Sequence, residues 1–252
     1  MTPFQQKFHL LLELQNATNN KISGSDWRIK AAPHTGIDFG MAAIDELHEF
    51  TVSAFHWKWW GKSDALDPKN ALMELVDILH FGISEDLVRS GAGPDDSAVS
   101  SRMAVAYKES EVNYQLAVAL QTADQSEQDH AAFQVFLLKQ AVKSMYISFA
   151  DNSKAVDWHS FWFALLLIGG DFDSVNKVYL GKASLNKFRQ ENGYKLGTYK
   201  KAWLLAGTNS ETVNNLTKED NQVLMEWLDT QADYTESSIH AFLTTSYSTL
   251  LN

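Results

Sequence analysis

The longest stretches of the chain carry helical periodicity and helix-start signals rather than strand patterns. Thr2-Pro3 and Asp67-Pro68 each place a capping side chain before a proline at the first helical position. No stretch alternates apolar and polar residues between hairpin turns, so strands should be few. Gly193 follows one helical stretch and is suited to a left-handed C-cap. The pattern predicts an all-α fold, a multi-helix bundle with helices near residues 3–20, 40–57, 68–89, 97–122, 127–149, 155–168, 172–192, 217–231 and 236–250.

Composition indicates a globular protein of a reducing compartment. Of 252 residues, 45% are hydrophobic, which is enough to fill a sizeable core. The chain has no cysteine, which excludes disulfides, thiolate metal sites and a cysteine nucleophile. Residues 1–14 lack the layout of a signal peptide, and the longest apolar run, 161–168, is too short to span a bilayer. We therefore expect a cytoplasmic protein with no membrane partner, folded as a single domain over residues 1–252. Residues of about 95–170 would form a helical elaboration without recognisable site motifs.

Charge is distributed unevenly along the chain. The net charge of −10 argues against nucleic acid as a partner. Between residues 177 and 203, however, seven lysines and arginines stand against a single acid, Glu191. Lys182, Asn186 and Arg189 are spaced by four and three, so they would share one polar helix face. Lysine and arginine bind phosphate well, although a solvated basic face would explain each residue taken singly.

Two predicted helices carry acidic pairs three residues apart, Glu46 with Glu49 and Glu74 with Asp77. A solvated face is the usual explanation of one such pair. The helix over 68–89 is different, because it is apolar almost all round and its polar residues Glu74, Asp77 and His80 form one narrow line.

A metal ion would explain this line of acids. Neither Glu74 nor Asp77 has a lysine or arginine three or four residues away on its helix, and a buried carboxylate needs a cation. Four carboxylates from two packed helices suit a hard ion such as Mg²⁺. A di-iron site is the alternative, but it would use Glu-x-x-His motifs, which neither acidic helix contains.

Four segments, in order, resemble the dimeric all-α dUTPases, a family related to phage dCTPase/dUTPases and to the all-α NTP pyrophosphatase superfamily. The segments are Leu14–Asn19, Glu46-x-x-Glu49 followed by Trp57-Lys58-Trp59-Trp60, Glu74–Phe81, and a last stretch from Gly181-Lys182 through Leu185-Asn186-x-Phe188-Arg189, Gly193-Tyr194 and Gly197-x-Tyr199-x-Lys201-x-Trp203 to Glu219-Asp220-Asn221. The resemblance implies a homodimer that uses Mg²⁺ to hydrolyse dUTP to dUMP and pyrophosphate, which limits dUTP and supplies dUMP.

The resemblance also implies roles for individual residues. The metal ligands would be Glu46, Glu49, Glu74 and Asp77. Glu49, with Glu46 beside it, would be catalytic and would activate the attacking water. The phosphate-binding residues would be Lys182, Arg189, Tyr194 and Lys201. The base and deoxyribose would be surrounded by Gln15, Asn19, His80, Phe81 and Asn186, with Trp60 nearby and Asn221 as a further substrate-binding residue.

Two other functions remain open at this point. The same metal-binding helices with a different base pocket would hydrolyse dCTP or another nucleoside triphosphate. A helical protein that binds a polyanion without chemistry would also use the basic segment, but it has no reason to place carboxylates along a nearly apolar helix.

Overall fold

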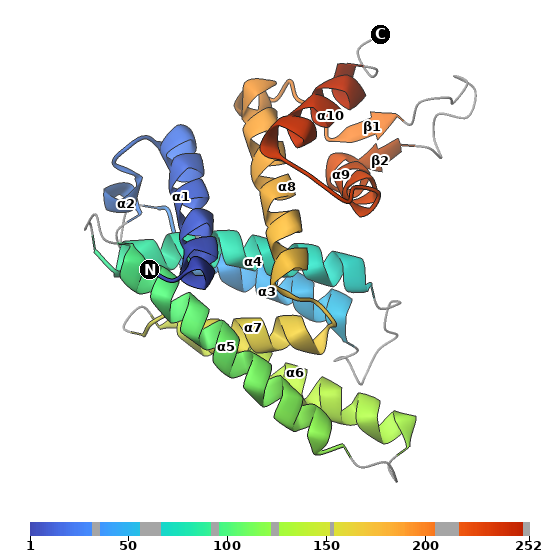
Figure 1. The fold of residues 1–252 in the computed structure, drawn as a ribbon. Coiled ribbons are helices and arrows are strands. Elements are labelled where there is room, and N and C mark those ends of the chain that lie inside the picture. The colour runs from blue at the N-terminus through green and yellow to red at the C-terminus, as the bar shows by residue number, and fades with distance from the viewer. Residues whose placement is uncertain are drawn as a thin grey trace. The chain divides into compact units, whose positions relative to one another are not determined.

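The computed structural model describes residues 1–31, 36–55, 67–91, 96–121, 126–151, 154–204 and 217–248. In this part the chain forms ten α-helices, one 3₁₀ helix and one two-stranded sheet, which confirms the predicted all-α fold. The chain divides into two compact units, Met1–Phe172 and Asp173–Asn252 (Figure 1). Whether these units fold as a single domain stays a prediction. Among the described helices, none has the length and apolar character needed to cross a membrane.

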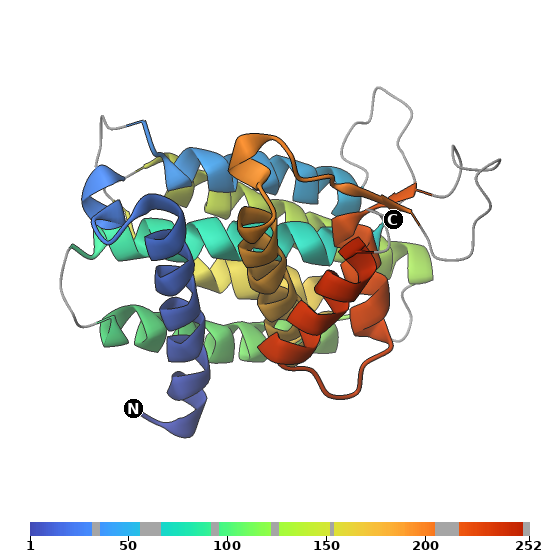
Figure 2. The same ribbon diagram turned by 90° about the horizontal axis from the view of Figure 1, so that it is seen from above.

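The first unit is a bundle in which α4 packs along α3. Its helices are α1 (Pro3–Ser23), α2 (Trp27–Lys30), α3 (Phe39–Ala54), α4 (Pro68–Arg89), α5 (Ser97–Ala119), α6 (Glu127–Ala150) and α7 (Trp158–Leu167). Helix α7 packs on both α5 and α6, and α6 also contacts α3. Helix α1 crosses α4 and α5 near one end of the bundle (Figure 2). The central position of α4 explains why that helix is apolar on almost every side.

Capping residues determine where several helices begin. The Thr2 hydroxyl accepts a hydrogen bond from the Gln5 amide, and the Asp67 carboxylate accepts one from the Asn70 amide. Both caps precede a proline, as the sequence predicts. Asp157 caps α7 in the same way, so that helix begins at residue 158 rather than near 155.

An aromatic cluster ties the middle of the chain to its N-terminus. The rings of Phe8 and Phe172 have centroids 4.7 Å apart, and those of Tyr107 and Trp162 are 5.4 Å apart. These four rings come from α1, α5, α7 and the start of α8, and all are buried. The described residues of the predicted helical elaboration form α5, α6 and α7, and they contribute buried side chains to the core of the first unit.

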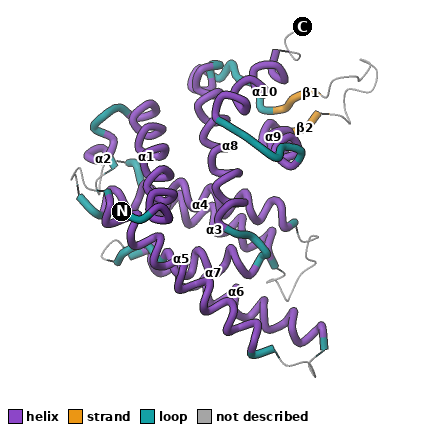
Figure 3. Tube along the Cα trace, viewed as in Figure 1, coloured by secondary structure: helices purple, strands orange, loops and turns teal. Residues whose placement is uncertain are grey.

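The second unit contains most of α8 and a small sheet. Its elements are α8 (Phe172–Glu191), which starts at the last residue of the first unit, η1 (Tyr194–Leu196), β1 (Ala202–Leu204), β2 (Thr217–Glu219), α9 (Asp220–Asp229) and α10 (Glu236–Ser248). The strands pair antiparallel with Trp203 opposite Lys218, and α9 contacts both of them (Figure 3). Gly193 has a φ of 88°, which confirms the predicted left-handed residue after α8.

The predicted helix near 217–231 is wrong at its start. Residues 217–219 form β2, and α9 begins only at Asp220. Their backbone groups bond across to β1, a partner that lies outside the segment and leaves no local trace in its sequence.

Candidate active site

Two hydrogen bonds connect the end of α3 to the start of α4. The Asp67 amide donates to the Ser53 carbonyl at 3.0 Å, and the Asn70 side-chain amide donates to the Ser53 hydroxyl at 2.7 Å. The two helices therefore run antiparallel. Glu46 lies two helical turns before Ser53, and Asp77 lies two turns after Asn70. Glu46 and Asp77 are therefore opposite each other in the hairpin.

Three of the predicted metal ligands come together in this hairpin. Glu46, Glu74 and Asp77 each offer a carboxylate oxygen, and these oxygens lie within 4.8 Å of one another. Glu74 is buried, and the other two are half-buried. Negative charges this close repel, and a hard cation offsets the repulsion. Ligands that are all carboxylate oxygens fit Mg²⁺.

Glu49, the fourth predicted ligand, is not part of this cluster. It lies one turn from Glu46 on α3, and its side chain is exposed. An exposed carboxylate beside the cluster is better placed to meet water than a buried one, so the catalytic role expected for Glu49 stays a prediction.

A buried polar network lies between α1 and α4. The side-chain nitrogens of Gln15 and Asn19 both donate to the Ser84 hydroxyl, at 3.0 and 2.9 Å. The Gln15 nitrogen also donates to the Asn19 carbonyl oxygen at 3.0 Å, and the Gln15 oxygen lies 2.6 Å from His80 Nδ1. The structure thus joins three of the predicted base-binding residues, and it adds Ser84, which the sequence analysis missed.

The predicted aromatic contacts to the base are only partly described. Phe81 is half-buried on α4, with its ring centroid 6.5 Å from that of Phe39. Trp60 lies outside the described residues, together with the rest of the Trp57–Trp60 segment. The role of both residues stays a prediction.

The polar face expected on α8 exists, but it is more enclosed than its spacing predicts. Lys182 is only 5% exposed, and its ammonium donates to the Asn221 side-chain oxygen at 3.4 Å. Arg189 Nη1 donates to the Asn186 side-chain oxygen at 3.3 Å. These contacts bring Lys182 and Asn221 together, and the substrate-binding role of Asn221 stays a prediction.

Arg189 forms an ion pair with Asp220, the first residue of α9. Arg189 Nε and Nη2 donate to the two oxygens of the Asp220 carboxylate, at 2.9 and 2.6 Å. The Asp220 side chain is fully buried, and the Tyr199 hydroxyl donates to it at 2.8 Å. Burial opposes the charge on Arg189, but the hydrogen bonds and charge of Asp220 outweigh it, so the pKa of Arg189 lies above its ordinary value. Burial and Asp220 also raise the pKa of Tyr199, which keeps that hydroxyl a donor.

Tyr194 and Lys201 complete the cationic group of the second unit. The Lys201 ammonium lies 5.6 Å from the centroid of the Tyr194 ring, and the Arg189 guanidinium lies 6.0 Å from it. Both Tyr194 and Lys201 are exposed. The cationic group of the second unit therefore consists of Lys182, Arg189 and Lys201, and it is exposed to solvent at Lys201. This group is suited to binding an anion.

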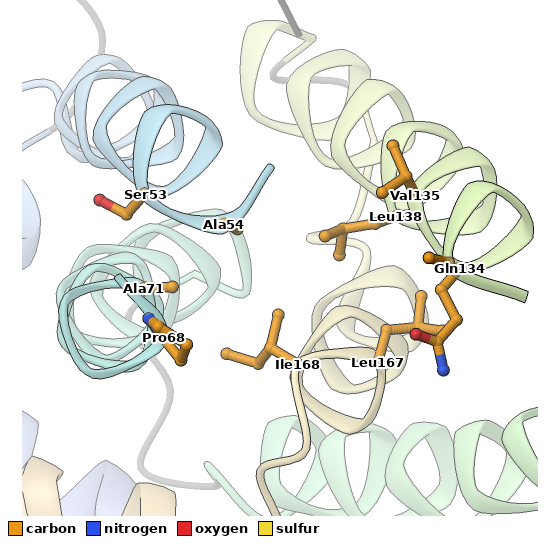
Figure 4. Close-up of a pocket in the computed structure, with 10 residues that line it drawn as sticks. Ser53, Ala54, Pro68, Ala71, Gln134, Val135, Leu138, Leu167 and Ile168 are labelled. Atoms are coloured by element: carbon orange, nitrogen blue, oxygen red, sulfur yellow. The ribbon is translucent and has the colours of Figure 1, made fainter. Parts of the chain in front are cut away.

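The first unit also contains an apolar pocket of about 230 Å³ between the ends of α3 and α4 on one side and α6 and α7 on the other (Figure 4). It is lined by Ser53, Ala54, Pro68, Ala71, Ala131, Gln134, Val135, Leu138, Leu167 and Ile168. None of the lining side chains that the structure describes is charged.

Clustered carboxylates on a helical hairpin are suited to a divalent cation, and the cationic group of the second unit is suited to a phosphate anion. The model of the dUTPase family matches residues 7–194, and the chain belongs to this family. It is therefore a nucleotide pyrophosphatase by family. A comparison with curated proteins finds no match. The matched range includes both acidic helices and α8, whereas Lys201 and Asn221 lie beyond it.

Proposed function

We propose that this protein binds Mg²⁺ and hydrolyses dUTP to dUMP and pyrophosphate. The observation that carries the proposal is the cluster of Glu46, Glu74 and Asp77 oxygens within 4.8 Å of one another, in a chain of the dUTPase family. One water is consumed, the bond between the α- and β-phosphates breaks, and pyrophosphate leaves.

The carboxylates of the α3–α4 hairpin would hold the metal. Glu46, Glu74 and Asp77 supply oxygen ligands on two helices that are fastened end to start, which keeps their geometry rigid. When bound, Mg²⁺ neutralises and polarises the phosphate oxygens. Glu49 is exposed one turn from Glu46, and it would take the proton of the attacking water.

The cationic group of the second unit would bind the phosphate chain. Asp220 balances the charge of Arg189, so Arg189 would contribute a directed N–H bond from Nη1 more than net charge. The net positive charge would come from Lys182 and Lys201. Tyr194 and Asn221 would add hydrogen bonds.

The buried network would surround the base. Uracil presents two carbonyl acceptors and one N–H donor along one edge. Both N–H groups of Gln15 are used within the network, so Gln15 would accept from this edge through its oxygen and Asn19 would donate to it through its second N–H. His80 joins the network through Gln15, while Phe81, Trp60 and Asn186 would contact the ring and deoxyribose.

Initial rates of pyrophosphate release from a panel of nucleoside triphosphates, with Mg²⁺ and with EDTA, test this function. We expect dUTP to react fastest and EDTA to abolish turnover, because the carboxylate cluster has no catalytic use without a cation. Equal rates with dUTP and dCTP would contradict a preference for dUTP and favour the broader substrate range. Activity that survives chelation would remove the metal from the mechanism. Binding of triphosphates without any turnover would favour the polyanion-binding alternative.

We also propose a homodimer, as the resemblance to dimeric dUTPases implies. Helix α5 exposes apolar side chains along one stripe, with Val105, Val112 and Leu116 at least half exposed. A stripe of this kind is suited to burial against a second copy. Sedimentation equilibrium should return twice the chain mass of 28.3 kDa, and a mass of one chain at micromolar concentration would contradict the proposal.

A further inference from the structure

We infer that Ser84 is a positioning residue that sets the choice between uracil and cytosine, by holding the amides of Gln15 and Asn19 in one orientation. The inference rests on the proposed function, since it concerns the base that the same site reads. Ser84 lies on α4, one turn after His80, and its side chain is fully buried.

The hydroxyl of Ser84 acts as an acceptor toward both amides. Its single proton is donated to the His80 carbonyl at 2.9 Å. Only lone pairs are then left for the side chains of Gln15 and Asn19, whose polar atoms lie 3.0 and 2.9 Å from it. Both amides must therefore turn their NH₂ groups toward Ser84.

This constraint spreads through the network. With its nitrogen held by Ser84, Gln15 directs its oxygen to His80 Nδ1 at 2.6 Å. A neutral histidine must then carry its proton on Nδ1. If the Gln15 amide were turned over, its oxygen would face two other acceptors, the Ser84 hydroxyl oxygen and the Asn19 side-chain oxygen. Ser84 thus favours one orientation of both amides, and the His80 tautomer follows that of Gln15.

Amides held in a fixed orientation distinguish uracil from cytosine. Uracil has an N–H donor at N3 and an acceptor at O4, whereas cytosine has an acceptor at N3 and an NH₂ donor at the 4 position. An amide that can turn over satisfies either edge, but an amide held in one orientation satisfies one and leaves unpaired groups against the other. Leaving buried polar groups unpaired is the strongest way for a site to reject a near-isostere.

The inference is tested with Ser84→Ala, against Ser110→Ala as a matched control. Ser110 is also fully buried and also donates to the carbonyl four residues earlier, but its hydroxyl contacts only backbone carbonyls, those of Ala106 and His159. Ser84→Cys, which keeps the volume and weakens the acceptor, serves as a second variant in case the alanine variant does not fold.

The readout is the ratio of kcat/KM for dUTP to that for dCTP, together with the ratio of dUMP to dCMP affinity measured by calorimetry. We expect both Ser84 variants to lose about tenfold or more of each ratio, the size of effect that one misdirected hydrogen bond produces, and Ser110→Ala to keep the wild-type ratios. A base-selective wild type whose ratios are unchanged in both Ser84 variants would overturn this inference alone. An equal loss for both nucleotides would also overturn it, because that result is the mark of a purely structural serine. Failure of the wild type to hydrolyse dUTP is a different result and would overturn the proposed function.

Discussion

Asp77→Asn should leave the protein folded but lower kcat/KM for dUTP by at least about a hundredfold, a loss of about 2.7 kcal/mol in transition-state stabilisation. The variant keeps the shape of the side chain and removes one of three clustered carboxylate charges. In EDTA it should melt higher than the wild type, because the remaining carboxylates repel each other less. Saturating Mg²⁺ stabilises a folded protein by about 2.7 kcal/mol at a hundred times its dissociation constant. The wild type should therefore melt about 5–10 °C higher with Mg²⁺, and the variant should gain much less.

Asp45→Asn is the matched control for this experiment. Asp45 lies next to Glu46 on α3, but its side chain is exposed and it is not part of the carboxylate cluster. Its neutralisation should change stability by at most ~0.5 kcal/mol and leave the response to Mg²⁺ intact. Thermal melts of the three proteins, each with EDTA and with Mg²⁺, give the answer. Equal Mg²⁺-induced shifts in the wild type and Asp77→Asn would remove Asp77 from the metal site.

Arg189→Ala should destabilise the protein by about 3–5 kcal/mol, because it leaves the buried Asp220 carboxylate without its counter-charge. Loss of a charge-assisted phosphate contact should also reduce kcat/KM by about ten- to a hundredfold at temperatures where the variant is folded. The loss of stability follows from a side chain that is only 11% exposed and binds both oxygens of one carboxylate, and the loss of activity follows from the proposed phosphate contact. Chemical denaturation and steady-state kinetics measure them separately.

A double variant separates the two roles of Arg189. Arg189→Met with Asp220→Leu removes the whole ion pair and fills its place with apolar atoms, which often restores stability. Only part of the stability should return, because Tyr199 still loses the acceptor of its hydroxyl, whereas activity should not return. Arg189→Ala with wild-type stability would show that the ion pair with Asp220 contributes nothing to the fold. Full activity in the double variant would show that Arg189 does not touch the substrate.

Most of the helices could be predicted because their signals are local. Asp67-Pro68 starts α4 and the apolar pattern carries it to Arg89, the same bounds that the sequence predicts. The missed elements depend on distant partners. The four residues of α2 are too few to show a period, and their place is set by Trp27, which is buried and bonded to Asn16. Strand β2 exists because β1 pairs with it, which no pattern within 217–231 reveals.

The site residues also divide into those with a local signal in the sequence and those that depend on distant partners. The acids of α3 and α4 stand out because their spacing puts them on helix faces where carboxylates are costly. Ser84 could not be predicted, because a serine on a buried helix is common. Only the structure shows that two side-chain amides donate to its hydroxyl. Asp220 lies far along the chain from Arg189, so a run of cations suggested an open basic face where the structure has a buried ion pair. Gln15 and Asn19 are one helical turn apart, so their side-chain amides lie on the same face of α1. This spacing could have indicated that they share a hydrogen-bond partner.

Phosphorus NMR of the products formed from dUTP in Mg²⁺ shows which phosphate bond the enzyme breaks. We expect the signals of the triphosphate to be replaced by those of dUMP and pyrophosphate in equal amounts, with no dUDP at any time, and Asp77→Asn to give neither product at a comparable rate. Appearance of dUDP with orthophosphate would contradict it, since the bond broken would then be the terminal one and the protein would not be a pyrophosphatase of dUTP.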